Sequence, residues 1–124
     1  MTIIEAVNGI DSFKTNTYSQ EDKIQWLSKL DMTVKLEIID THEGGDDIEF
    51  SGYTSATPVD TVMLIPAPHE DVYLRWLEAQ IDYANGEFGK FNNSITMFNA
   101  AYAAFANYYN RTHMPKGQKL RALT

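Results

Sequence analysis

The sequence predicts an all-α fold, a small four-helix domain that ends in a long αα-hairpin. Apolar side chains recur every three or four residues over most of the chain, the spacing that one buried helix face produces. Cysteine is absent, which excludes disulfides and thiolate metal sites, and 124 residues suffice for one domain with its own core. We expect a single helical domain over 1–113 and a basic, flexible C-terminal tail over 114–124.

The first two helices are predicted from their start signals and apolar stripes. Residues 2 to about 10 form a short helix, with Gly9 near its end. A longer helix begins after Ser19, a good N-cap residue, and runs to about Thr41, where two consecutive glycines supply a stop. Its apolar stripe consists of Ile24, Leu27, Leu30, Val34 and Ile38.

The segment at about 44–68 is predicted to be irregular. Three prolines, three glycines and clusters of Asp, Ser and Thr mark turns there. Residues 48–50 and 62–65 could each add a short strand, together forming a short β-hairpin, or pack as extended chain over the helices.

A third helix is predicted from the His69-Glu70-Asp71 start to about Ala84. Most of its circumference is apolar or aromatic, so we expect neighbours on several sides. Its one charged stripe consists of Asp71, Arg75, Glu78 and Asp82. We interpret this stripe as a solvated face of ion pairs rather than as the site of a catalytic carboxylate pair.

The last helix raises the question of a membrane span, because the twenty residues 91–110 carry no charge. As a helix they would reach ~30 Å, the thickness of a bilayer core. Five asparagines and no Leu or Val exclude that interpretation, since each amide needs a partner in hydrocarbon. A core-facing seam with coiled-coil spacing is predicted instead: Phe91, Ile95, Phe98, Tyr102, Phe105 and Tyr109.

The remaining faces of this helix are uncharged and rich in Asn, Ala and Tyr. Buried centres of protein interfaces are depleted in charge and enriched in aromatic residues. We therefore expect a surface for subunit or partner contact: Met97, Asn99, Ala103, Ala104, Asn107, Tyr108 and Asn110.

Charge is distributed very unevenly along the chain. Residues 1–87 hold all 17 acids and five bases, a net charge of −12, and residues 88–124 hold five bases and no acid. Such asymmetry is typical of an acidic body with a basic tail. An acidic body argues against a DNA- or RNA-binding domain, because cations on phosphates supply most nucleic-acid affinity.

No catalytic or metal-binding motif stands out. The acidic residues between Asp40 and Glu49 could attract a hard cation, but their spacing does not fit a calcium loop, so we interpret them as an acidic turn after a helix stop. His42, His69 and His113 lie at turns or helix edges, where solvated or capping roles are expected. We expect no enzyme activity, no metal and no cofactor.

The order of these elements resembles that of the small head–tail connector (adaptor) proteins of long-tailed bacteriophages and of prophages in Gram-positive bacteria. The residues that carry most of this resemblance are 73–117, YLRWLEAQIDYANGEFGKFNNSITMFNAAYAAFANYYNRTHMPKG. The resemblance covers most of the chain and implies a structural role. About a dozen copies would form a ring under the portal protein and join the DNA-filled head to the tail and stopper proteins. DNA would pass through the ring without specific binding.

The resemblance also implies a location, and the placement of charge along the chain suggests a role for the tail. We expect the protein in the virion neck, and in the cytoplasm of the bacterial host during assembly, without membrane attachment. The basic tail would dock on an acidic surface of the portal through Arg111, Lys116, Lys119 and Arg121. Two alternatives stay open: a small helical regulatory or antitoxin-like protein with one partner, and an enzyme or metal-binding domain that uses the acidic turn.

Overall fold

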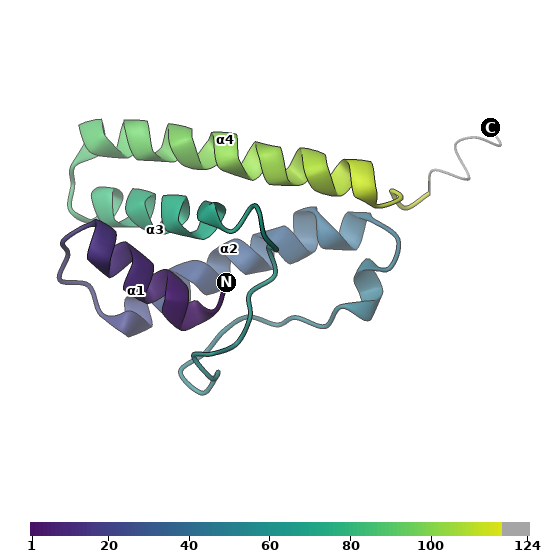
Figure 1. Ribbon diagram of the computed structural model, residues 1–124, viewed down its shortest axis with the longest axis horizontal. Helices are drawn as coiled ribbons and strands as arrows, with labels where there is room; N and C mark the ends of the chain where they lie inside the picture. Colours follow the sequence, from purple (N-terminus) through teal and green to yellow (C-terminus); the bar gives the residue numbers. More distant parts are fainter. Residues whose placement is uncertain (118–124) are drawn as a thin grey trace.

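The computed structural model describes residues 1–117 and contains four α-helices and two single-turn 3₁₀ helices (Figure 1). The elements in chain order are α1 (Ile3–Phe13), α2 (Gln20–Glu37), η1 (Ile39–Thr41), η2 (Gly45–Asp47), α3 (Asp71–Ala84) and α4 (Phe88–Thr112). The predicted all-α fold is confirmed. Of the two alternatives for residues 48–50 and 62–65, the short β-hairpin does not form, since the described backbone makes only two isolated bridges, Thr2 with Val62 and His42 with Pro115.

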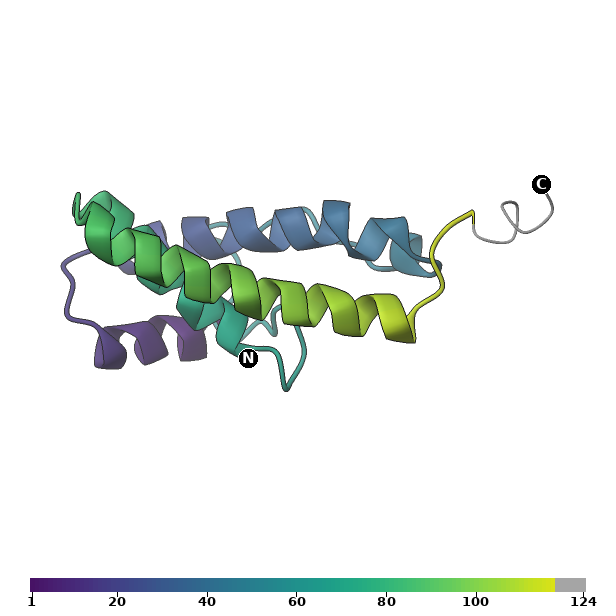
Figure 2. The same ribbon diagram turned by 90° about the horizontal axis from the view of Figure 1, so that it is seen from above.

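α3 and α4 form the predicted antiparallel hairpin, and α3 is the central helix of the domain. It packs against α4 on one side and against α1 and α2 on the other. In Figure 2, α4 crosses in front of α3, with α2 along one side and α1 along the other. Because α4 is much the longer helix, its C-terminal half extends past the start of α3, toward the end of α2 (Figure 1).

α1 is longer than predicted because Gly9 lies inside the helix. A Cβ at this position would come within 3.0 Å of the Leu74 side chain, so glycine serves the close approach of α1 to α3. The helix begins with a capping box in which Thr2 and Glu5 satisfy each other's backbone N–H groups. The irregular segment completes this cap. The carbonyl of Thr61 accepts from the Ile3 N–H at 3.1 Å, and the carbonyl of Val59 accepts from the Ile4 N–H at 2.9 Å.

The irregular segment is held to the helices by the buried carboxylate of Asp31 on α2. Tyr53 and Tyr73 donate their hydroxyls to this carboxylate, and the Leu64 N–H donates to it at 3.2 Å. The Tyr73 hydroxyl also accepts from the Ile65 N–H at 2.7 Å. Burial raises the pKa of the Asp31 carboxyl, against the lowering effect of the three donors. One side chain thus ties α2, α3 and residues 53–65 together.

Candidate subunit interface on α4

The inner face of α4 is the predicted aromatic seam. Phe98, Phe105 and Tyr109 are buried, with Phe105 only 1% exposed. The other three seam residues, Phe91, Ile95 and Tyr102, are half-buried. Phe98 packs against Trp76 of α3 and Phe91 against Tyr83, with ring centres 4.9 and 5.3 Å apart, so the seam fixes which face of α4 is turned outward.

The opposite face of α4 is exposed and carries no charge between Lys90 and Arg111. Most of the residues predicted for a contact surface lie on it, and they are exposed: Met97, Asn99, Ala103, Ala104 and Asn107. Met97 is the one large apolar side chain among them and is 48% exposed. We call these five residues, together with the exposed Asn92, Asn93, Thr96 and Ala100 on the same helix, the outer face. Its short, uncharged side chains would let another helix or a flat surface approach closely.

Two of the predicted contact residues are used inside the chain. The Tyr108 ring is half-buried beside the His69 imidazole, with ring centres 5.0 Å apart. The Asn110 amide oxygen lies 2.9 Å from Nε2 of His42. External contact through these two residues stays a prediction, and both already have partners within the chain, because α4 extends beyond α3 and there meets other parts of its own chain.

His42 is buried, although a solvated or a capping histidine was expected at this position. It is only 4% exposed, and its Nδ1 lies 2.6 Å from the carbonyl oxygen of Ile38 at the end of α2. Its ring meets the Tyr109 ring edge to face, with centres 4.8 Å apart. The capping role expected for it is present, and it also joins the C-terminal ends of α2 and α4.

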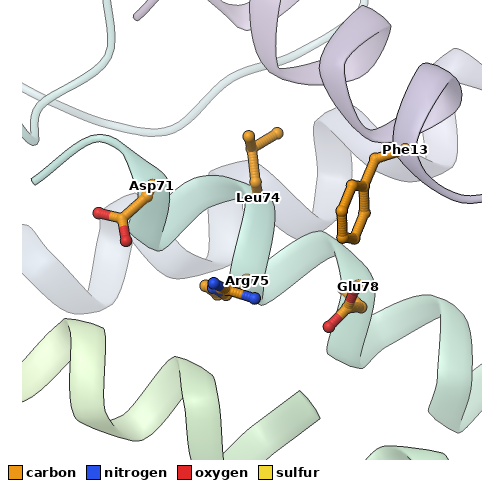
Figure 3. A pocket seen from close by; sticks show the side chains of 5 residues that line it. All are labelled: Phe13, Asp71, Leu74, Arg75 and Glu78. Atoms are coloured by element: carbon orange, nitrogen blue, oxygen red, sulfur yellow. The ribbon is translucent and has the colours of Figure 1, made fainter.

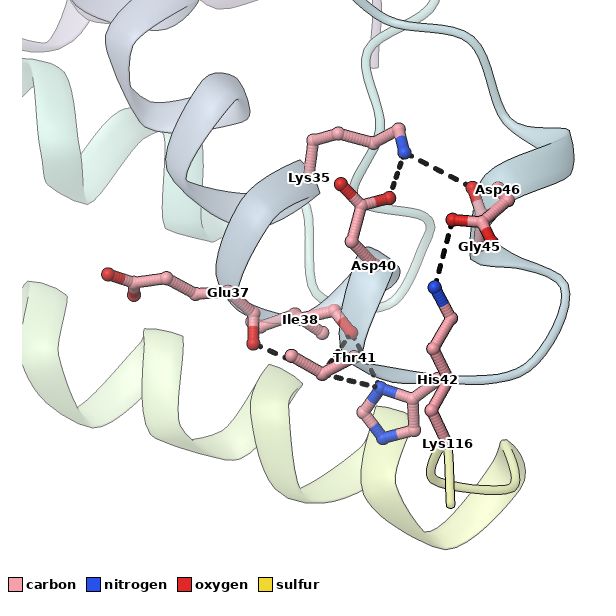
Figure 4. Close-up of polar contacts among 9 residues, drawn as sticks. All are labelled: Lys35, Glu37, Ile38, Asp40, Thr41, His42, Gly45, Asp46 and Lys116. Carbon is pink, nitrogen blue, oxygen red and sulfur yellow. Dashed lines mark hydrogen bonds and ion pairs between the residues drawn. The ribbon is translucent and has the colours of Figure 1, made fainter.

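The basic tail is not free where it begins. Arg111 belongs to α4, and the backbone of residues 114–116 pairs with residues 41–43. Figure 4 shows Lys116 reaching the carboxylate of Asp46, at 2.9 Å from Nζ to Oδ1. The expectation of a loose tail from residue 114 was thus wrong up to Gly117, and Lys119 and Arg121 lie outside the described residues.

The acidic turn is stabilised by lysines of the chain. Lys35 forms an ion pair with Asp40 and donates to the Gly45 carbonyl at 3.1 Å (Figure 4). The Lys116 ammonium lowers the pKa of the Asp46 carboxyl below its ordinary value. Gly45 itself is required by sterics, since a Cβ there would lie 2.0 Å from the carbonyl oxygen of Ile39. Within residues 1–117 no group of three or more His, Asp or Glu side chains is arranged to hold a metal ion.

The charged stripe of α3 is only partly a solvated face. Asp82 is 1% exposed, and its carboxylate forms an ion pair with Lys14, whose Nζ lies 2.5 Å away without the alignment of a hydrogen bond. The burial of Asp82 was not predicted, because Lys14, which covers this end of α3, directly follows α1 and lies far from Asp82 in the sequence. The buried charge is compensated, so it is structural.

The first two turns of α3 line a pocket of about 150 Å³ beside the exposed ring of Phe13 (Figure 3). Leu74 and Phe13 form its apolar side, and Asp71, Arg75 and Glu78 line the rest. The two acids alternate with the arginine along the helix, so the groups that line this pocket balance one another's charge in part.

The buried Asp31 cluster is the polar feature that sequence reasoning missed. A signal for it exists, because Asp31 lies four residues after Leu27 and three before Val34, on the predicted buried stripe of α2. A carboxylate at such a position needs hydrogen-bond donors. Which tyrosines supply them is decided by the irregular segment and by α3.

Among the residues that the structure describes, no helix combines the length and the apolar character that crossing a membrane requires. α4 is long enough, but its asparagines keep it too polar. Compared with family models, with curated proteins and with solved structures, the chain matches none.

Proposed function

We propose that this chain is a structural, non-enzymatic protein that assembles with copies of itself, as a head–tail connector (adaptor) of a long-tailed phage or prophage. In this role a ring of about a dozen copies lies under the portal protein in the virion neck and joins the filled head to the tail and stopper proteins. Before assembly the protein is in the cytoplasm of the bacterial host.

The observation that carries the proposal is the outer face of α4. In a chain with 22% charged residues, this helix exposes Asn, Ala, Thr and Met over residues 92–107 without one charge. Solvated helix faces are normally rich in charged residues, whereas the centres of interfaces are depleted in them. A surface for another protein explains this composition.

Charge supports the same role. Residues 1–87 carry −12, which repels a DNA backbone and therefore suits a ring through which DNA passes without sticking. The opposite charge of residues 88–124 lets Arg111, Lys119 and Arg121 dock on an acidic surface of the portal, while Lys116 is already paired with Asp46.

The test is native mass spectrometry of the full chain, alone and with the portal protein from the same genome. We expect rings, either free or on addition of the portal. A stable one-to-one complex with another protein and no self-association would favour the regulatory, antitoxin-like alternative instead.

A matched pair of variants locates the contact. Ala103→Glu places a charge in the middle of the outer face, and Asn8→Glu places the same charge on an exposed position of α1. We expect Ala103→Glu to abolish assembly, because a buried unpaired carboxylate is strongly unfavourable, and Asn8→Glu to assemble normally. Equal assembly by both variants would exclude the outer face.

A further inference from the structure

A groove runs along α3 on the side where α1 and α4 flank it. It consists of two pockets, the one of about 150 Å³ beside Phe13 and a second of about 210 Å³ nearer the corner between α3 and α4. Glu78 lines both pockets, so they adjoin each other along α3 (Figure 3). Other residues of the second pocket come from the end of α1, from α3 and from the first turns of α4: Lys14, Asp82, Lys90, Asn93 and Met97.

Exposed apolar side chains lie at both edges of the groove. The Phe13 ring is 67% exposed at the α1 edge, on the apolar side that it shares with Leu74 (Figure 3). At the α4 edge the Met97 side chain is 48% exposed. Covering these side chains would remove apolar area from water, which favours association. The groove is therefore suited to hold another segment of protein.

The charges that line the groove balance one another. Three are basic and three are acidic: Lys14, Arg75, Lys90, Asp71, Glu78 and Asp82. An incoming acid would meet the carboxylates and an incoming base would meet the cations, so neither is favoured. Lys14 and Lys90 each face one carboxylate in an ion pair and keep further N–H donors for a neutral acceptor, such as an amide oxygen. The groove thus suits an uncharged segment that carries hydrogen-bond acceptors.

The centre of the outer face of α4 has these properties. Opposite the buried Phe98 and Phe105 lie four exposed residues at spacings of 4, 3 and 4, which we call the outer stripe: Thr96, Ala100, Ala103 and Asn107. The two alanines leave room for a large ring, and the Thr and Asn side chains carry acceptor oxygens. The outer stripe and the lining of the groove consist of different residues, so one copy can use both surfaces at once.

We propose that the outer stripe of one copy packs in the groove of the next copy. This inference rests on the self-association proposed above. Because the stripe and the groove are different surfaces, each copy offers one of them to each of its two neighbours. Such a contact continues from copy to copy and can close into a ring. Two like outer faces would instead meet about a two-fold axis and stop at a pair.

Two variants block the two surfaces one at a time. Phe13→Glu adds a charge to the balanced groove, and Ala103→Glu adds one to the outer stripe. Both positions are exposed, so both variants should fold, which circular dichroism and thermal melts verify. Under the condition in which the wild type assembles, we expect each variant alone to assemble at least ~10-fold less well, because the contact would bury an unpaired charge.

A mixture of the two variants distinguishes the proposed contact from a contact between like faces. Phe13→Glu keeps an intact stripe and Ala103→Glu keeps an intact groove, so together they can form one correct contact. We expect native mass spectrometry of the mixture to show pairs with one molecule of each variant and nothing larger. A contact between like outer faces would bury the new charge of Ala103→Glu and would yield no such pairs.

Two further variants serve as controls. Asn8→Glu places the same charge on an exposed position of α1 outside the groove, and Phe13→Leu keeps an apolar side chain at the edge of the groove. We expect both to assemble as the wild type does. Loss of assembly in Asn8→Glu equal to that in Phe13→Glu would assign the effect to added charge in general and would contradict the groove as the contact.

The outcomes separate this inference from the proposed function. A wild type that forms rings, together with Phe13→Glu that forms them equally well, would overturn the contact with the groove and leave the connector proposal standing. Absence of mixed pairs under the condition in which the wild type assembles would do the same. A wild type that stays monomeric under all conditions, with the portal included, would overturn both.

Discussion

The inner and outer faces of α4 share one helix and differ in what their side chains stabilise. The inner face buries aromatic rings against α3, with Phe105 at 1% exposure, whereas the outer face exposes small uncharged side chains. Burial of apolar area supplies most folding free energy, so the inner face determines whether the domain folds. The outer face contributes little to that free energy, so folding does not account for its lack of charge, on which the proposed contact with a second protein rests.

The largest effect is expected on the inner face. Phe105→Ala should lower the free energy of unfolding by ~3–5 kcal/mol, because it removes buried area and leaves a cavity. Phe98→Ala, at 8% exposure, should approach the same loss. Urea denaturation followed by circular dichroism measures both. A decrease in the free energy of unfolding well below 1 kcal/mol in both variants would show that the seam does not stabilise the domain.

A smaller effect is expected to distinguish Tyr73, which is part of the core, from Tyr102, which packs against it. Tyr73→Phe should cost ~1–3 kcal/mol, because it leaves the buried Ile65 N–H without its acceptor and removes a donor from Asp31. Tyr102→Phe should cost nothing or stabilise, since the Tyr102 hydroxyl is buried without a hydrogen-bond partner in the described residues. Burial raises the pKa of Tyr102 to about 12, consistent with that hydroxyl staying neutral. Equal losses for the two variants would contradict the assigned contacts.

The pH dependence of stability tests the Asp31 cluster. Because the pKa of Asp31 is raised in the folded state, folding favours the protonated carboxyl. Its contribution is full below the ordinary Asp pKa of about 4 and falls as pH rises through the folded pKa. The stability of the wild type relative to Asp31→Asn should therefore decrease with pH from about 4 upward. A flat difference would show that the three donors balance the effect of burial, and a difference that increases with pH would show that they outweigh it.

The smallest effect on folding is expected on the outer face. Ala103→Glu should change the free energy of unfolding of the monomer by less than ~0.5 kcal/mol, as exposed substitutions usually do. A thermal melt under conditions where the wild type is monomeric measures it. Combined with the expected loss of assembly, this result would assign the outer face to contact alone. A large destabilisation would instead assign it to the fold.

Much of the fold follows from local sequence signals. The apolar spacing of α2 and α4, the start at Ser19 and the corner after Ala84 predict four helices and a terminal hairpin, and the structure has them. These features are predictable because each depends on residues within one or two turns of each other. The exposure of the uncharged face of α4 is predictable for the same reason, once the seam fixes which side of the helix is buried.

Tertiary structure decided the features that depend on residues far apart in the chain. Asp82 is buried because Lys14 reaches it from the end of α1, and Asp31 is satisfied by Tyr53 and Tyr73 from two other segments. The pairing of Lys116 with Asp46 likewise joins positions seventy residues apart. By itself the sequence determined where helices form and which of their faces are apolar, since periodicity is a local property. Which charges are buried, and where the C-terminal residues attach, depends on how the helices meet, because a buried polar group needs partners that only packing brings within reach.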